Sequence, residues 1–283
     1  HYEANPEAIE PRSAYNEVMS FIRQGLTDIS MSRSSVRWGI PLSWDERQVI
    51  YVWFDALLNY ATAAGYGADP ESVEGQRFAR LWPPDVNLVG KDILRFHAVY
   101  WPAMLMAAGL EPPRKVFAHG WLLVGGEKMS KSKLTGIAPS QITDTFGSDA
   151  FRYYFLSAIT FGQDGSFSWE DLSARYQAEL ANGFGNLASR VIAMVIRYFD
   201  GSIPAAPLDE VITSIEKRVT DAANTQIDAF AINEALATIW ELVDALNGYI
   251  TDTEPWALAK DPAQRERLES VLSTAGDIEI SKI

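Results

Sequence analysis

Short apolar runs alternate with segments of helical composition in the first half of the chain. The runs Val49–Trp53, Val86–Gly90 and Val116–Trp121 are rich in β-branched and aromatic residues, which is typical of buried strands. The segments 55–65 and 92–108 between them predict helices. This alternation predicts a parallel α/β sheet, in which ligands bind beyond the carboxyl ends of the strands. These ends carry Trp53-Phe54-Asp55, Gly90-Lys91-Asp92 and His119-Gly120-Trp121.

The first 45 residues have a different character. Prolines punctuate the segment, and apolar positions recur at helical spacing over residues 13–25. We interpret this part as an end-piece made of a surface helix and a loop.

Helical periodicity dominates after residue 148. An aromatic helix is expected over Phe151–Ser157, and Ser168 and Asp171 have the spacing of a capping box at the start of a helix that runs to Phe199. Gly183 and Gly185 each cost that helix about 1 kcal/mol relative to alanine, which suggests a kink or a close approach by another backbone. Further helices are expected over residues 211–230, 232–250 and 262–275, so this part is an α-helical bundle. Residues 276–283 do not continue the helical pattern.

Composition narrows the possible functions. The chain has 283 residues, is 47% hydrophobic, contains no cysteine and has three histidines, so thiol chemistry is excluded and no metal site is expected. No apolar run approaches the roughly 20 residues of a membrane span, and the first residues lack a signal-peptide pattern, so we expect a cytoplasmic location. The net charge of −13 argues mildly against nucleic-acid binding, although a local basic strip is enough for docking.

One motif carries specific chemistry. The stretch from His119 to Ser132 combines a short apolar strand, a Gly-Gly turn and the pentapeptide Lys128-Met-Ser-Lys-Ser132. Lysine and serine side chains suit phosphate binding, because both donate hydrogen bonds to phosphate oxygens and lysine adds a compact positive charge. Most Lys/Ser runs are only solvated loops, but this pentapeptide would arise by chance in roughly one chain of this length in ten thousand.

Lys128–Ser132 resembles the second signature of class I aminoacyl-tRNA synthetases, and residues 11–260 look like bacterial methionyl-tRNA synthetases. The resemblance implies the second half of a parallel, nucleotide-binding Rossmann-type sheet followed by an α-helical anticodon-binding domain. It divides the chain into an insertion end at 1–45, a catalytic part at 46–121, a signature loop with a stem-contact region at 122–170, and a helical domain at 171–283. It also implies methionine, ATP with Mg²⁺ and tRNA(Met) as substrates, and we expect a monomer without a metal site of its own.

For ATP, the resemblance implies that Lys128 and Lys131 meet the departing pyrophosphate and that loop closure brings Lys131 in. Gly90 would let the nucleotide approach the backbone, and Asp92 would accept from the ribose hydroxyls. Leu122 would line the adenine pocket through its backbone. The residues alone favour a simpler role for Asp92, as the cap of the helix that follows.

For methionine, the resemblance implies an apolar pocket with aromatic walls, where sulfur–aromatic contacts are favourable. Without it, these would be core residues and the histidine a satisfied core histidine. The implied residues are Trp53, Ala56, Leu57, Tyr60, Ile93 and His97. The tyrosine and the histidine would help to reject side chains that lack sulfur.

For tRNA, Asn182, Asn186 and Arg190 recur every four residues and form a polar stripe, while Val191 and its apolar neighbours can face a core. The resemblance implies that this stripe, together with Pro255 and Trp256, recognises the CAU anticodon, with the tryptophan stacked on its first base. The simpler interpretation is a solvated stripe and a buried tryptophan. The acidic balance predicts modest, salt-sensitive tRNA binding.

The chain departs from the family in one important respect, because it lacks the first class I signature, His-Ile-Gly-His. We therefore expect these residues to be the C-terminal part of a larger enzyme and to form no adenylate alone. Two alternatives remain. A synthetase for valine, isoleucine, leucine or cysteine shares the Lys-Met-Ser-Lys-Ser loop but not the methionine-type residues, and a tRNA-binding relic without catalysis would not need Lys131, Asp92 and His97.

Overall fold

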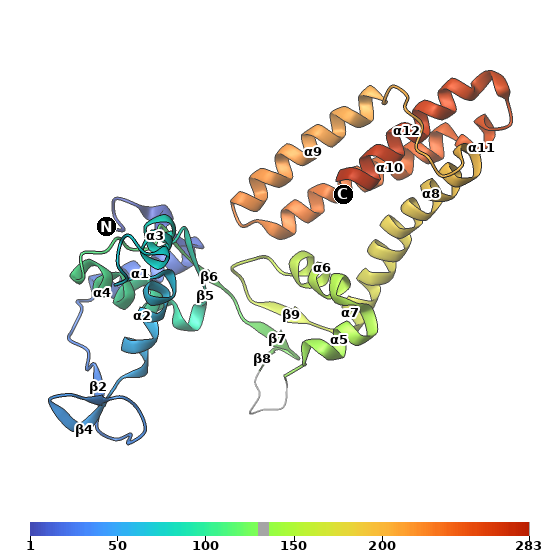
Figure 1. Ribbon diagram of the computed structural model, residues 1–283. Coiled ribbons are helices and arrows are strands. Elements are labelled where there is room, and N and C mark those ends of the chain that lie inside the picture. The colour runs from blue at the N-terminus through green and yellow to red at the C-terminus, as the bar shows by residue number, and fades with distance from the viewer. Residues whose placement is uncertain (130–135, 283) are drawn as a thin grey trace. The chain divides into compact units, whose positions relative to one another are not determined.

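The computed structural model describes residues 1–129 and 136–282, with the backbone alone given for residues 278–282. The chain forms two compact units, His1–Trp121 and Leu122–Ile283 (Figure 1). The elements of the first unit are β1 (Ile9–Glu10), α1 (Arg12–Arg23), β2 (Ser32–Arg33), β3 (Pro41–Leu42), β4 (Asp45–Ile50), α2 (Val52–Ala64), α3 (Val73–Leu81), β5 (Val86–Gly90), α4 (Trp101–Ala107) and β6 (Lys115–His119).

A parallel sheet of three strands, in the order β1-β6-β5, forms the core of the first unit. The predicted strands Val86–Gly90 and Val116–Trp121 are confirmed, and the α/β class with them. The two-residue strand β1 was not predicted, because it is too short to show a period. Helix α1 lies at the predicted position with one face exposed, and its other face, including the fully buried Val18, packs against the sheet.

The predicted strand over Val49–Trp53 is largely wrong. Strand β4 ends at Ile50 and belongs to a separate antiparallel sheet of order β2-β4-β3, while α2 already begins at Val52. A run of five apolar residues does not distinguish a strand from the start of a buried helix. Tertiary packing decides for the helix here, because Leu57 and Ala61 bury one face of α2 against α4.

The helix expected over residues 92–108 is present, but it is not uniform. A 3₁₀ turn covers Lys91–Ile93, a π-helical turn covers Phe96–Tyr100, and only then does α4 begin. The π turn holds one residue more than an α turn, so it shifts which side chains share a face.

The second unit contains β7 (Leu122–Val124), β8 (Glu127–Lys128), α5 (Pro139–Phe146), α6 (Ser148–Ala158), β9 (Gly165–Phe167), α7 (Trp169–Arg175), α8 (Asn186–Phe199), α9 (Glu210–Asp228), α10 (Ile232–Thr253), α11 (Pro255–Leu258) and α12 (Arg265–Lys282). Strand β7 pairs with β8 in a hairpin and with β9 in parallel. Gly125 and Gly126 form the hairpin turn with φ of +61° and +81°, values that glycine adopts without strain.

The long helix predicted from Ser168 to Phe199 is confirmed, and the hydroxyl of Ser168 caps its first turn by accepting from the backbone N–H of Asp171 at 3.0 Å. Between α7 and α8 this helix contains the π-segment, which we define as Tyr176–Gly185. Helices α8, α9, α10 and α12 pack as the predicted bundle (Figure 1), around buried residues such as Val191, Leu246 and Leu272.

The end of the chain differs from expectation, because α12 continues as far as Lys282. Val271, Leu272 and Ala275 are buried in the bundle and anchor this helix, which lets it run on through a sequence with a weak helical pattern of its own. None of the helices in the described ranges is long and apolar enough to cross a membrane.

Candidate functional site

One face of α2 carries four of the residues expected at the methionine pocket. Trp53, Ala56, Leu57 and Tyr60 stand at positions i, i+3, i+4 and i+7, the spacing of a single helical face. Leu57 is buried at 2% exposure, whereas Tyr60 is 38% exposed at the other end of the face. The face therefore runs from the core of the first unit to its surface.

His97 meets this face from the π turn. Its side chain is 1% exposed, its Nδ1 lies 3.0 Å from the carbonyl oxygen of Ile93, and its Nε2 lies 2.9 Å from the hydroxyl of Tyr60. A carbonyl only accepts, so Nδ1 carries the hydrogen and Nε2 accepts from Tyr60. Burial lowers the pKa of His97, an effect partly opposed by the hydrogen bond to Ile93. The imidazole is thus a neutral group with a defined tautomer.

Aromatic rings surround this pair. The Trp53 ring stacks on Phe96 at 4.4 Å and 17°, and meets His97 edge-on at 6.4 Å. Sequence reasoning missed Phe96, although it stands three residues after Ile93 and next to His97, positions that share a helical face. Ile93 is placed differently from expectation: its side chain packs toward the sheet core, and its carbonyl holds His97.

Gly90 and Asp92 lie at the carboxyl edge of the parallel sheet, where Gly90 stands opposite His119 in the register of β5 and β6. A Cβ on Gly90 would lie 2.7 Å from Asp92 Oδ1, closer than such atoms approach in practice. Glycine therefore allows the carboxylate to fold back over the strand end. Lys91 places its ammonium 4.2 Å from the centre of the Trp121 ring at the same edge. The edge thus presents a carboxylate, a cation and a bare backbone, which together suit a nucleotide.

The β7–β8 hairpin holds the start of the signature loop. The carbonyl of Leu122 accepts from the backbone N–H of Met129 at 3.0 Å, and Leu123 stands opposite Lys128. Lys128 is exposed at the end of β8. Lys131, the second predicted catalytic residue, lies outside the described residues.

In the second unit, Arg190 and Trp256 come together although they are far apart in sequence. The Arg190 guanidinium carbon lies 5.9 Å from the centre of the Trp256 ring, within the range of a cation–π contact. Asn182 and Asn186 are exposed on the same long helix, and Asn182 accepts from the side-chain amide of Gln177 at 3.2 Å. Pro255 is buried at the start of α11, while Trp256 remains 39% exposed. An exposed aromatic ring beside a guanidinium, with two exposed amides on the same helix as the arginine, is suited to unpaired bases.

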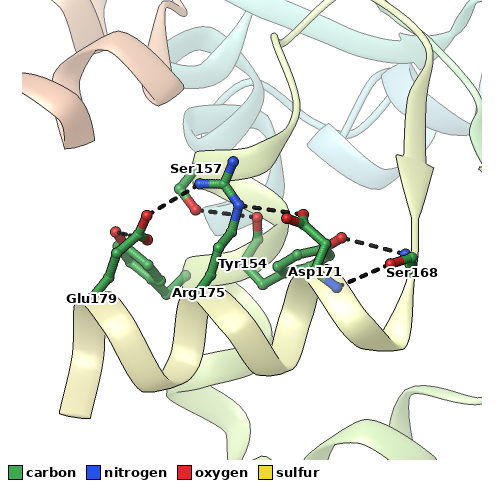
Figure 2. Close-up of polar contacts among 7 residues, drawn as sticks. Tyr154, Ser157, Ser168, Asp171, Arg175 and Glu179 are labelled. Atoms are coloured by element: carbon green, nitrogen blue, oxygen red, sulfur yellow. Dashed lines mark hydrogen bonds and ion pairs between the residues drawn. The ribbon is translucent and has the colours of Figure 1, made fainter. Parts of the chain in front are cut away.

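A polar network beside this surface was not predicted. Arg175 lies between two carboxylates on one helix face (Figure 2), with its Nε 3.3 Å from Asp171 and its Nη1 3.4 Å from Glu179. Glu179 in turn accepts from the hydroxyl of Tyr153 at 2.7 Å. The i, i+4 spacing of the charges was visible in the sequence, but the tyrosine comes from α6 and could not be assigned. In the described ranges, no cluster of three or more His, Cys, Asp or Glu is arranged to bind a metal ion.

The chain is similar to known proteins over nearly its whole length. The model of a family described as tRNA synthetases class I (M) matches residues 1–192. The Methionine--tRNA ligase of Streptomyces coelicolor is 55% identical over 284 residues, which cover 98% of this chain and 52% of that protein. The Methionine--tRNA ligase of Clostridium perfringens is 49% identical, covering 96% of this chain and 42% of that protein. The chain thus spans about half the length of the curated relatives it matches.

Solved structures agree with these matches. Mycobacterium tuberculosis methionyl-tRNA synthetase in complex with methionyl-adenylate superposes with a TM-score of 0.92 at 41% identity, over 99% of this chain and 55% of that one. The apo form of the same synthetase gives a TM-score of 0.88 at 38% identity, again over 99% of this chain and 55% of that one.

Proposed function

The chain belongs to the family of class I tRNA synthetases (M), and from this premise we propose that it forms the part of a methionine–tRNA ligase that binds methionine, part of the ATP molecule and the tRNA anticodon. The observation that carries the proposal is the pairing of Tyr60 with buried, neutral His97 beside the stacked rings of Trp53 and Phe96. A thioether makes favourable contacts with aromatic rings, and an uncharged polar pair gives the sulfur atom a partner without attracting charged side chains.

Activation joins methionine to ATP at the carboxyl edge of the parallel sheet. The methionine carboxylate attacks the α-phosphorus, the bond from that phosphorus to the bridging oxygen breaks, and pyrophosphate leaves with its electrons. Asp92 accepts from the ribose hydroxyls, and Gly90 leaves space for the nucleotide. Lys128 and Lys131 offset the negative charge of the leaving pyrophosphate, because such displacements depend on positioning and electrostatic stabilisation. Leu122 contributes backbone to the adenine pocket, and Mg²⁺ enters with ATP.

Recognition of tRNA(Met) uses the second unit. Trp256 offers an exposed ring for stacking on the first anticodon base, and Asn182, Asn186 and Arg190 offer amide and guanidinium hydrogen bonds to the bases of CAU. These groups lie on described and mostly exposed positions, which supports a surface that reads single-stranded RNA.

A chimera tests the catalytic proposal, because this chain covers only half of its relatives. The chain replaces the matching segment of the S. coelicolor Methionine--tRNA ligase, and methionine-dependent exchange of pyrophosphate into ATP is measured. We expect exchange with methionine and far less with leucine. Lys131→Ala should abolish exchange, whereas Lys133→Ala, which removes the same charge two residues further on, should leave most of it.

The outcomes separate the alternatives. A chimera that folds and binds tRNA(Met) but exchanges no pyrophosphate would favour the tRNA-binding relic. Exchange driven equally by valine, isoleucine or leucine would contradict the methionine assignment.

The proposal also includes a monomeric state and a cytoplasmic location. Sedimentation of the chain at micromolar concentration tests whether it is a monomer.

A further inference from the structure

The π-segment Tyr176–Gly185 requires glycine at two positions. A Cβ on Gly185 would lie 2.8 Å from the carbonyl oxygen of Leu180, five residues earlier in the same helix. A Cβ on Gly183 would lie 2.8 Å from Cζ3 and 3.1 Å from Cη2 of Trp240. The sequence suggested a close backbone at these glycines, whereas the close group at Gly183 is an indole ring from α10. The two glycines therefore mark a wide turn against which a neighbouring helix is tightly packed.

Hydrogen bonds tie this wide turn to its neighbours. The Trp240 indole N–H donates to the hydroxyl of Tyr153 on α6, and that hydroxyl donates to Glu179 inside the π-segment at 2.7 Å. Asn247, two turns further along α10, donates to the carbonyl of Gly183 at 3.5 Å and to that of Val243 at 3.1 Å. Helices α6 and α10 thus both hold the π-segment.

Two ion pairs of Arg175 strengthen the contact between Tyr153 and the π-segment. Arg175 bridges Asp171 and Glu179 (Figure 2), so the carboxylate that accepts from Tyr153 is itself held in place. Burial, and then the hydrogen bond to Glu179, raise the pKa of Tyr153, which therefore remains a neutral donor. Because these side chains are between one-third and one-half exposed, the Arg175 ion pairs orient their partners more than they stabilise the fold.

A π turn changes the direction in which later side chains point. Each residue of an α-helix turns by about 100°, so one inserted residue rotates everything beyond it by about that angle. Asn182 lies inside the π-segment, and Asn186 and Arg190 lie just beyond it. The extra residue of the π-segment therefore sets the direction in which Asn186 and Arg190 point relative to α7 and to Asn182.

We propose that Trp240 and Tyr153 are positioning residues that lock the π-segment, so that Asn186 and Arg190 keep their direction relative to Asn182 and Arg190 stays beside Trp256 at the proposed anticodon surface. The inference rests on the proposed function. Neither residue touches RNA in this arrangement; Trp240 acts through Gly183, and Tyr153 acts through Glu179.

The test measures fluorescence anisotropy of the full chain with two RNA hairpins, one with a CAU loop and one with the loop changed to GGG. Gly183→Ala forces the Trp240 ring away, and we expect it to reduce the preference for CAU by about tenfold, the size of one lost base contact. Gly248→Ala is the matched control, because its added Cβ on α10 meets nothing within 4 Å.

Tyr153→Phe is a second test of the proposal, because it removes the hydrogen bond to Glu179 without a steric clash. We expect a several-fold loss of the CAU preference while the helical circular dichroism is retained. A wild-type preference for CAU that survives both Gly183→Ala and Tyr153→Phe would overturn this inference alone. A wild-type chain that binds both hairpins equally would overturn the proposed function and the inference together.

Discussion

The Tyr60→Phe variant removes one hydroxyl and keeps the ring. His97 commits its Nδ1 to the carbonyl of Ile93, so the Tyr60 hydroxyl at 2.9 Å is the donor to its Nε2. The histidine is 1% exposed and cannot turn toward solvent to replace that donor. The variant therefore leaves a buried acceptor without its partner.

The expected cost follows from this geometry. A buried acceptor that loses its donor costs about 1–3 kcal/mol. Tyr60 is 38% exposed, so water approaches from its side, and we expect the lower end, about 1 kcal/mol, to be lost from the free energy of unfolding of the first unit. If the hydroxyl also orders the pocket for methionine, the same energy corresponds to about fivefold weaker methionine binding.

The assay must report on α2, because two units contribute to any global unfolding signal. Native-state hydrogen exchange at the backbone amides of α2 gives the local free energy of opening. Tyr66→Phe is the matched control, since this tyrosine is 44% exposed just beyond the same helix and its ring packs on Phe78 at 5.5 Å.

A double-mutant cycle separates the hydrogen bond from other effects of substitution. Tyr60→Phe, His97→Leu and the double variant should give a coupling free energy of about 1 kcal/mol. The reasoning is refuted if Tyr60→Phe and Tyr66→Phe differ by less than about 0.3 kcal/mol and the cycle gives no coupling above that level.

Four further outcomes are expected. Burial lowers the pKa of His97 below its ordinary 6.5, so the unfolded chain binds more protons than the folded chain. The contribution of neutral His97 to stability is therefore complete above pH 6.5 and is lost as the pH falls from 6.5 toward the lowered pKa. Urea midpoints measured over this pH range should fall less in His97→Gln than in wild type. Trp256→Ala in the chimera should weaken aminoacylation of tRNA(Met) while sparing pyrophosphate exchange, with the similarly exposed Trp169→Ala as control. Leu246→Ala, at a fully buried position, should lower the free energy of unfolding of the bundle by about 2–5 kcal/mol in urea. Asp209→Ala removes the side chain that accepts from two N–H groups at the start of α9 and should cost about 1 kcal/mol in the same assay, and a cost near zero would contradict the cap.

The sequence predicted strands and helix ends best where a few neighbouring residues were enough to define them. Strands β5 and β6 were predicted from apolar runs, and the cap at Ser168 from its spacing to Asp171. Strand β1 escaped prediction because two residues show no period, and it is stable only through its pairing with β6. Val52 and Trp53 were assigned to a strand because their intrinsic preference for strands favoured it, and the packing of α2 overrides that preference.

The groups at the candidate sites were harder to predict, for a physical reason that both units share. Each site includes a residue of a π turn, His97 of Phe96–Tyr100 in the first unit and Asn182 of Tyr176–Gly185 in the second. An inserted residue changes which side chains share a face, and a search for a period of 3.6 averages over that change. Phe96 beside Trp53 and Trp240 beside Gly183 are both contacts made by residues of these turns with another helix, which a single-helix pattern does not contain.

These wide turns cost the helix regular hydrogen bonding, so other contacts must retain them. In the first unit the hydrogen bonds of His97 to Ile93 and Tyr60 do so, and in the second the contact of Trp240 with Gly183 does so. A substitution that removes such a contact favours a return to the α form, which rotates the residues beyond the turn, buried Trp101 in the first unit and buried Val191 in the second among them. Loss of specificity together with some loss of stability is therefore expected at both places, whereas substitution of a core residue such as Leu246 should mainly lower stability.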